Sequence, residues 1–326
     1  MSNPLISIVF TSYNHQRFLT QAIESLLAQT FSDFELIVVD DCSTDGSRDI
    51  LLKYQTHPKV RLYLREINSG SYVKSTNYGA QQAKGKYLLF AQCDDFAEPI
   101  QLERLHQALL ANPSVGVAFC RSRMIDENGQ SLGTDFDHRS DEFRHHCAGD
   151  TKISRVQMKR FLGESCVIPN LSAALLSREL YIRVGGLSVN YLVLADWAFW
   201  LDLAQLTDFY YVAAPLNNFR QHDATIRSKI KLQRQILEIY EMFEDVIRRY
   251  PTGLSERFRL KINRARAWMV FYSASPSAWK ESFKDIWKDI HQIDRLAWFY
   301  FLLAAWVRGI GFLGKKIKQL LKGVLE

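Results

Sequence analysis

The sequence predicts an α/β fold in which helices flank a mostly parallel sheet and a helical extension follows. Apolar, β-branched runs alternate with segments of helical periodicity in the N-terminal part of the chain, as expected when crossover helices connect parallel strands. The run 87–91 is continuously apolar and leads to Asp94 and Asp95, which is typical of a strand buried on both faces. Beyond about residue 227 only helical periodicity remains.

The individual elements follow from local patterns in chain order. Apolar residues over 5–10 predict the first strand, and their helical spacing over 18–27 predicts the first helix. The same patterns then alternate, with strands expected over 34–39, 60–64 and 87–91 and helices over 47–54 and 72–83. Polar loops follow three of these strands, at 11–14, 40–47 and 92–95. Because open α/β sheets bind ligands at the carboxyl ends of their strands, we expect these loops to form one site.

The three loops carry groups suited to a nucleotide. Tyr13 can stack on a base, Asp40 can accept from a base N–H, and a divalent ion on Asp94 can screen a diphosphate. Neither a Walker A lysine loop nor a G-x-G-x-x-G pattern follows the first strand, so P-loop and dinucleotide sites are not predicted. The alternative is that Asp94 and Asp95 form a solvated turn before the helix expected near Pro99.

Longer motifs carry a family resemblance. In chain order they are I-S-I-V-F-T-S-Y-N-H (6–15), F-E-L-I-V-V-D-D-C-S-T-D-G-S (34–47), N-S-G (68–70), N-Y-G-A (77–80), A-K-G-K-Y-L-L-F-A-Q-C-D-D (83–95), V-G-G-L (184–187), A-D-W (195–197) and L-N-N-F-R-Q-H (216–222). In this order they resemble an inverting glycosyltransferase of family 2, with the Rossmann-like GT-A fold, of the type that builds bacterial surface polysaccharides.

The resemblance implies transfer of a sugar from a nucleotide diphosphate sugar, with UDP expected, to a hydroxyl of a saccharide or a lipid-linked saccharide, with inversion. It also implies Mn²⁺ or Mg²⁺ as cofactor, because a divalent ion stabilises a departing diphosphate. The residues expected to bind the nucleotide are Thr11, Tyr13, Asn14, Asp40, Asp41, Lys74, Asn77, Cys93 and Asp94. Those expected on the acceptor side are Asp95, Asn170, Ser172 and Trp197.

The chemistry itself is assigned to three side chains. Asp196 is the expected general base, and Asp94 with His222 is expected to hold the metal. Partial burial beside the aromatic residues that follow would raise the pKa of Asp196 and improve it as a base. Two alternatives stay open: Asp196 caps the helix that it starts, and His222 is a structural or surface residue.

The sequence departs from the family pattern at two positions. Gln92 stands in place of the first acid of D-x-D-D, and Ala195 stands in place of the Glu of an E-D pair. One carboxylate fewer predicts weaker metal binding. These departures keep open a catalytically inactive nucleotide-sugar-binding or scaffold protein. A sugar-nucleotide nucleotidyltransferase is a further alternative, but the Gly-rich phosphate loop that it needs after the first strand is absent.

We expect a nucleotide-sugar-binding half at 1–122, an acceptor-binding half of the same domain at 123–226, and the helical extension at 227–326. The apolar face of the 230–250 helix suits internal packing or a homo-oligomer contact. The run 296–307 is apolar throughout and is followed by Arg308 and several lysines. It is shorter than the ~20 residues that cross a bilayer. It suits a helix in the interface of an anionic membrane or, alternatively, a helix packed on protein.

Composition narrows the class and the compartment. Of the 326 residues, 47% are hydrophobic and 23% are charged, which is typical of a globular protein. The net charge of +6 comes without zinc-finger spacing or an RNA-binding signature, so no nucleic-acid partner is expected. Five cysteines without a C-x-x-C pair suggest reduced thiols in the cytoplasm. A strand that begins at Leu5 leaves no room for a signal peptide, so we expect a cytoplasmic protein, peripheral on the inner face of the cell membrane.

Overall fold

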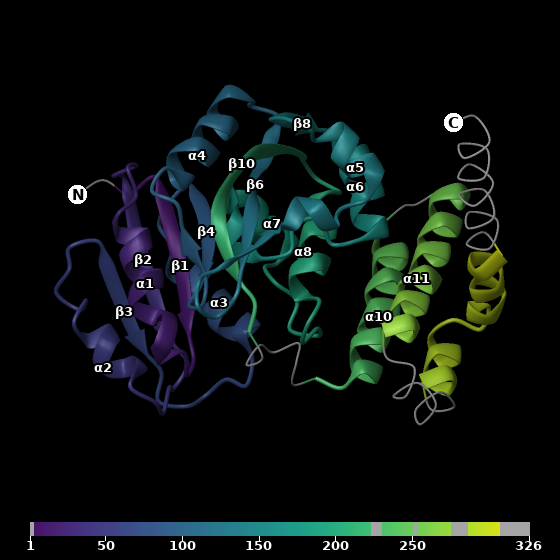
Figure 1. The fold of residues 1–326 in the computed structure, drawn as a ribbon, viewed down its shortest axis with the longest axis horizontal. Helices are drawn as coiled ribbons and strands as arrows, with labels where there is room; N and C mark the ends of the chain where they lie inside the picture. Colours follow the sequence, from purple (N-terminus) through teal and green to yellow (C-terminus); the bar gives the residue numbers. More distant parts are fainter. Residues whose placement is uncertain (1–2, 223–229, 251–252, 275–285, 307–326) are drawn as a thin grey trace, which may run out of the picture. The chain divides into compact units, whose positions relative to one another are not determined.

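The computed structural model describes residues 3–222, 230–250, 253–274 and 286–306 (Figure 1). The chain divides into two compact units, Met1–Ser228 and Lys229–Glu326. The first unit contains the sheet and the second contains helices. The basic segment expected at 308–322 lies outside the described residues.

The described part of the first unit contains a 10-stranded sheet. Its main path has the order β3-β2-β1-β4-β9-β6-β10-β5, and the remaining strands β7 and β8 pair with β6 and β10. The strands are β1 (Ile6–Ser12), β2 (Phe34–Asp40), β3 (Val60–Leu64), β4 (Tyr87–Gln92), β5 (Phe96–Ala97), β6 (Val115–Ile125), β7 (Ser131–Thr134), β8 (Thr151–Ile153), β9 (Ala174–Ser177) and β10 (Asp208–Arg220). The helices of this unit are α1 (Gln16–Leu27), α2 (Ser47–Leu52), α3 (Tyr72–Gln82), α4 (Gln101–Ala111), α5 (Asp141–His146), α6 (Arg155–Glu164), α7 (Arg178–Val184) and α8 (Ala195–Leu203), with short 3₁₀ turns η1 (Asp135–His138) and η2 (Leu171–Ala173).

The predicted α/β fold is confirmed, and its parallel part is the first half of the sheet. There β1 pairs in parallel with β2 and β4, and β2 with β3. In the second half β10 is parallel to β6, whereas β9 runs antiparallel between β4 and β6. Short antiparallel strands β5 and β8 also pair with β10, and β7 pairs with β6. The alternation of strands and helices did not predict the antiparallel pairs of β5, β8 and β9.

Helices on both faces explain why β1 and β2 are buried along their whole length. Alternate side chains of a strand point to opposite faces. Ile8 and Phe10 of β1 belong to one core cluster with Leu19 of α1 and Leu102 of α4. On the other face α3 approaches so closely that a Cβ on Gly79 would lie 2.5 Å from Cγ1 of Val9.

The described residues of the second unit include α10 (Leu232–Arg249), α11 (Leu254–Ala274) and helical residues within 286–306. Its core joins Ile236 and Tyr240 of α10 to Ile290 and Ala297. Arg264 is fully buried, donates to Glu244 and Asp294, and lies over the ring of Tyr240. The predicted apolar face of α10 is buried within the chain, so it packs against the other helices of this unit. A homo-oligomer contact through this helix stays a prediction.

The sequence predicts that the apolar run 296–307 is too short to cross a bilayer. Among the described residues, no helix combines the length and the apolar character that crossing a bilayer requires.

Candidate active site

The register of the sheet brings the three predicted loops to one edge. Ser12 at the end of β1 pairs with Asp40 at the end of β2, and Thr11 pairs with Gln92 at the end of β4. All three strands are parallel, so the loops that follow them leave the sheet on the same side. The predicted convergence of 11–14, 40–47 and 92–95 follows directly from this register.

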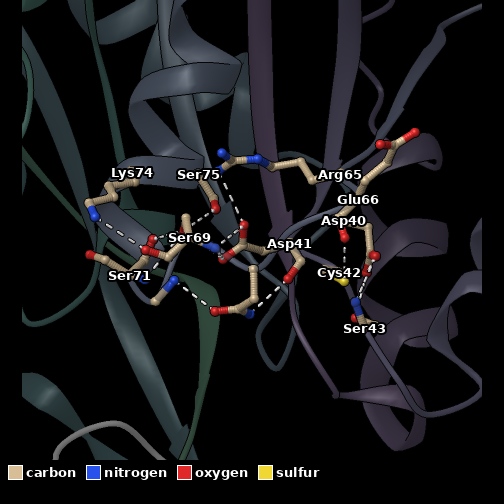
Figure 2. Close-up of polar contacts among 12 residues, drawn as sticks. Asp40, Asp41, Cys42, Ser43, Arg65, Glu66, Ser69, Ser71, Lys74 and Ser75 are labelled. Carbon is tan, nitrogen blue, oxygen red and sulfur yellow. Dashed lines mark hydrogen bonds and ion pairs between the residues drawn. The ribbon is translucent and has the colours of Figure 1, made fainter.

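The acids after β2 organise two loops (Figure 2). Asp41 is 4% exposed; Ser69 donates to its carboxylate through both its N–H and its hydroxyl, and Arg65 forms an ion pair with it at 3.2 Å. Asp40 is fully buried, and its carboxylate accepts hydrogen bonds from the Ser43 N–H and from the Arg48 guanidinium, each at 3.0 Å. Both carboxylates therefore already have internal partners. Contact between either acid and a base stays a prediction.

Two residues with left-handed backbone shape the same edge. Asn14 has φ +52° and Cys42 has φ +66°, an uncommon conformation for residues other than glycine. Asn14 is held by the β2 loop: its N–H donates to the Ser43 hydroxyl at 3.0 Å, and its side-chain oxygen accepts from the Thr44 N–H at 2.8 Å. Asn14 therefore positions the residues around it.

The turn after β4 brings Asp94 to two histidines. His222 Nε2 lies 3.1 Å from Asp94 Oδ2, and one ligand atom each of His15, Asp94 and His222 lies within 4.8 Å of the others. Burial by itself raises the pKa of Asp94, but the hydrogen bond from His222 and the nearby His15 outweigh burial and lower it. A carboxylate and two imidazoles at this spacing are a suitable donor set for a divalent ion.

Asp95 faces the interior beside Asp94. It is 4% exposed and accepts from the Asn170 amide at 3.1 Å and from the backbone N–H of Arg220 at 3.0 Å. Burial and the neighbouring charge of Asp94 raise the pKa of Asp95. Ser172, also buried, accepts from the backbone N–H of Gln92 at the end of β4. Asn170 and Ser172 thus support the turn that presents Asp94.

Arg220 locks this turn from the end of β10. Its guanidinium donates to the backbone oxygens of Asp94, Asp126 and Glu127 and to the side chain of Gln21, and it lies 4.5 Å from the ring centre of Phe18. Arg220 is 3% exposed, so its contacts are structural. This role was not predictable from the sequence, because the partners come from three separate segments.

The remaining predicted nucleotide residues differ in exposure. Tyr13 is 45% exposed, whereas Thr11 and Cys93 are buried. Burial, together with Asp94, raises the pKa of the Cys93 thiol well above its usual value. Lys74 is exposed, and its ammonium donates to the backbone oxygen of Ser69 at 3.3 Å. Tyr13 and Lys74 are therefore the two with side chains open to a ligand.

Asn77 holds the loop after α7. Its amide donates to the backbone oxygen of Leu187 at 2.8 Å, and its oxygen accepts from the Leu187 N–H and the Tyr181 hydroxyl. Gly186 next to this contact has φ +77°, and a Cβ there would lie 2.8 Å from the Tyr181 hydroxyl. Asn77 is thereby tied to the V-G-G-L motif, and its contact with a nucleotide stays a prediction.

Asp196 lies in the first turn of α8. The other residues of this helix are buried, whereas Asp196 is half-buried and accepts from the backbone N–H of Trp197 at 2.7 Å. Phe199, one turn further along, packs against Phe90 of β4, the strand that leads to Asp94. Trp197 is 8% exposed, and its indole donates to the backbone oxygen of Leu162. The ring of Trp197 is therefore mostly a core group.

Sequence reasoning missed His15, although its signal was available. His15 directly follows the T-S-Y-N loop after the first strand, so it had to lie at the same edge as Asp94. An imidazole in such a loop is a candidate metal ligand on residue type alone.

Comparison with known sequences agrees with these motifs. The model of the family described as glycosyl transferase family 2 matches residues 7–185, more than half of the 326 residues. An uncharacterized glycosyltransferase of Haemophilus influenzae is 28% identical over 230 residues, which cover 69% of this chain and 71% of the relative. The putative teichuronic acid biosynthesis glycosyltransferase TuaG of Bacillus subtilis is 32% identical over 130 residues, 40% of this chain and 51% of TuaG. The match with TuaG thus spans about half of that relative.

Solved structures show the same fold. TarS of Staphylococcus aureus, residues 1–349 in complex with UDP, has a TM-score of 0.66 at 15% identity and covers 92% of this chain and 88% of its own. The mannosyltransferase PcManGT from Pyrobaculum calidifontis, in complex with GDP-Man and Mn²⁺, has a TM-score of 0.59 at 16% identity and covers 93% and 86%. At these identities the likeness concerns the GT-A fold alone. With the family match above, it leads to one conclusion: the chain belongs to glycosyl transferase family 2.

Proposed function

We propose that this glycosyltransferase moves a sugar from a UDP-sugar to a hydroxyl of a saccharide or a lipid-linked saccharide, with inversion at the anomeric carbon. The observation that carries the proposal is the cluster of His15, Asp94 and His222 at the carboxyl edge of the sheet. Inverting transfer needs a base for the acceptor and charge stabilisation for the departing diphosphate. The cluster is suited to the second task, and Asp196 is the candidate for the first.

The donor nucleotide contacts the loops after β1, β2 and β4. Tyr13, with its exposed ring, stacks on the base, and Lys74 reaches the phosphates. Asn14, Asp40 and Asp41 keep the loops after β1 and β2 in place through their internal hydrogen bonds. Asn77 does the same for the loop after α7. UDP is favoured because TarS, which has the same fold, is solved with UDP and with UDP-GlcNAc.

Asp94 and His222 hold a divalent ion, Mn²⁺ or Mg²⁺, which supplies positive charge to the departing diphosphate when it is bound. Their ligand atoms fit that task, because they lie within 4.8 Å of each other and of His15. Burial raises the pKa of Asp94, but the hydrogen bond with His222 and the nearby His15 lower it overall, which favours the charged form that binds a cation. Gln92 stands where the family pattern has the first acid and adds no negative charge. The imidazoles supply donor atoms in place of that missing carboxylate.

Asp196 acts as the general base that takes the proton from the acceptor hydroxyl. Two features support this role: it is the residue of α8 that is not buried, and α8 packs on β4 through Phe199. The acceptor binds on the side of Asp95, Asn170, Ser172 and Trp197. Because these side chains are buried, we propose that they shape the acceptor site without contacting the acceptor directly. Residues 1–122 then serve the donor and 123–226 the acceptor.

The second unit attaches the enzyme to the inner face of the cell membrane. Leu296, Trp298, Phe299, Leu302 and Trp306 are each more than half exposed. Tryptophan and other large apolar side chains on one helical segment suit the interface between lipid and water. An enzyme seated there reaches a lipid-linked acceptor.

The donor proposal is tested by thermal shift with UDP-, GDP- and dTDP-sugars, with and without Mn²⁺, followed by measurement of nucleoside diphosphate release. We expect stabilisation and turnover with a UDP-sugar, and a much smaller shift in Asp94→Asn. Binding without turnover for every donor would instead support the nucleotide-sugar-binding scaffold.

A further inference from the structure

We propose that His15 is a third protein ligand of the divalent ion, beside Asp94 and His222, and that this set favours Mn²⁺ over Mg²⁺. The inference rests on the proposed function, since it concerns the ion of the donor site. One ligand atom of each of the three residues lies within 4.8 Å of the others. Among the described residues this is the one group of three or more His, Cys, Asp or Glu that meets this spacing.

The hydrogen bonding of His15 prepares one of its ring nitrogens for a metal. Nδ1 lies 2.7 Å from the backbone oxygen of Tyr13. A carbonyl oxygen can only accept, so Nδ1 carries the proton and Nε2 of the neutral ring keeps its lone pair. Metal-binding histidines commonly donate their other N–H to a backbone carbonyl in this way, which fixes the tautomer and the ring orientation.

The backbone before His15 is held in an unusual conformation. Asn14 has φ +52°, a left-handed conformation that is uncommon outside glycine and persists where the surroundings enforce it. Here the β2 loop enforces it through Ser43 and Thr44, which bond the main chain and side chain of Asn14. The N–H of Gln16, after His15, donates to Asp45 at 3.1 Å. Both neighbours of His15 in the chain are thus anchored to the same loop.

His222 lies on the other side of Asp94, with Nε2 3.1 Å from Asp94 Oδ2. An ion between the two side chains would replace this hydrogen bond, with the neutral imidazole as ligand. The side chain of His222 is 4% exposed and that of Asp94 is 22% exposed. Its ring packs against Phe18 at 5.3 Å and against His15 at 5.7 Å between centroids. Arg220, two residues earlier, bonds the backbone oxygen of Asp94. The three donors therefore come from separate segments that share one rigid arrangement.

The composition of this set explains the preference for Mn²⁺. Mg²⁺ prefers oxygen ligands in near-ideal octahedral geometry, whereas imidazole is a good ligand for transition metals. Gln92 removes one oxygen anion from the family pattern, and His15 adds a nitrogen from the β1 loop. The set therefore contains two nitrogens and one carboxylate. Two carboxylates would bind Mn²⁺ and Mg²⁺ alike, whereas the nitrogens favour Mn²⁺.

The test uses Mn²⁺ alone with the full chain, without nucleotide. Pulsed electron paramagnetic resonance of bound Mn²⁺ detects nitrogen ligands directly. We expect couplings from two imidazoles in the wild type and from one in His15→Ala. His145→Ala is the matched control, because the Nδ1 of this exposed histidine also lies 2.6 Å from a backbone oxygen, that of Asp141, outside the cluster. Circular dichroism and the melting temperature check that each variant is folded.

Affinities measured by titration calorimetry give a second readout. Loss of a group that only supports a metal site costs 10–100-fold in affinity, so His15→Ala should weaken Mn²⁺ at least about tenfold and Mg²⁺ much less. His15→Asp, which replaces nitrogen by oxygen, should lower the Mn²⁺-to-Mg²⁺ affinity ratio further. His145→Ala should change neither.

Three results would overturn the inference: no bound Mn²⁺ in the wild type, an unchanged two-nitrogen signal in His15→Ala, or equal losses for both ions. The proposed function fails separately. A chain that binds Mn²⁺ through two imidazoles but transfers no sugar would keep the ligand set and lose the reaction. A chain that transfers sugar but shows only one imidazole on Mn²⁺ would keep the proposed function and refute His15 as a ligand.

Discussion

Asp196 is the residue on which the proposed proton transfer depends. In Asp196→Asn the side-chain oxygen can still accept from the Trp197 N–H, which it does at 2.7 Å in the structure, but the basic carboxylate is gone. General-base catalysis contributes typically 10²–10⁴-fold, so we expect kcat to fall by about that factor. The affinity for UDP, measured by calorimetry, should stay unchanged. Asp33→Asn is the control, because this exposed acid precedes β2 at the opposite edge of the sheet.

Retained turnover in Asp196→Asn, with an unaltered melting temperature, would refute the assignment of the base. The capping alternative does not apply either, because the N-cap of α8 is Leu194 and Asp196 lies inside the first turn. Asp196 would then be an acid whose charge favours the N-terminus of this helix.

Glu35 gives a prediction on pH and stability. Burial raises the pKa of Glu35, but hydrogen bonds from Arg61, Ser7 and the Lys84 N–H outweigh burial and lower it below 4.5. A lowered pKa stabilises the fold above the unfolded value, and this stability is lost as the pH falls through the folded value. Glu35→Gln should cost about 1–3 kcal/mol at pH 7.

The difference in the free energy of unfolding between wild type and Glu35→Gln should shrink as the pH falls below 4.5. Urea unfolding at a series of pH values measures it. A difference that does not change with pH would show that the charge of Glu35 is not its source.

At the scale of the elements, the entry into β4 depends on Gly85. A Cβ on Gly85 would lie 2.6 Å from the backbone nitrogen of Ser7 and 2.8 Å from the carbonyl carbon of Ile6. Because backbone atoms of a central strand cannot move aside cheaply, Gly85→Ala should destabilise the protein by about 1–3 kcal/mol. Gly149→Ala is the matched control, since nothing lies within 4 Å of its Cβ position. Urea unfolding that finds both variants equally stable would contradict this packing.

The elements that sequence reasoning predicted well are those with strong local patterns. The strands expected over 34–39 and 87–91 occur as Phe34–Asp40 and Tyr87–Gln92. Buried parallel strands and their helices show such patterns in one short window. β5 and β9 were missed because they have two and four residues and depend on partners far away in the chain. Two-residue and four-residue segments carry too little periodicity for a prediction.

The same distinction applies to the site. Asp94 was predictable, because two acids directly follow a fully apolar strand. The ion pairs of the buried Asp40 and Asp41 were not predictable, because nothing in the sequence distinguishes their partners Arg48 and Arg65 from ordinary surface cations. Only the folded chain shows that these acids brace loops.

At the scale of the whole molecule, the exposed apolar residues of the second unit predict membrane attachment. Replacing Trp298 and Trp306 together by serine leaves the buried Ala297 and Ala304 in place but removes the large interfacial side chains. We expect the double variant to stop co-floating with anionic lipid vesicles. Leu254→Ser is the control, because Leu254 is 88% exposed in the same unit but lies outside this segment. Unchanged flotation of the double variant would argue for a helix that packs on protein.

The central claim is that sugar transfer with inversion takes place at the edge of the sheet where Asp94 lies. The most direct measurement is the anomeric configuration of the product, determined by nuclear magnetic resonance from an α-linked UDP-sugar with Mn²⁺ and a saccharide acceptor. We expect a β-linked product from the wild type and none from Asp94→Asn. An α-linked product, or full activity of Asp94→Asn, would contradict the claim.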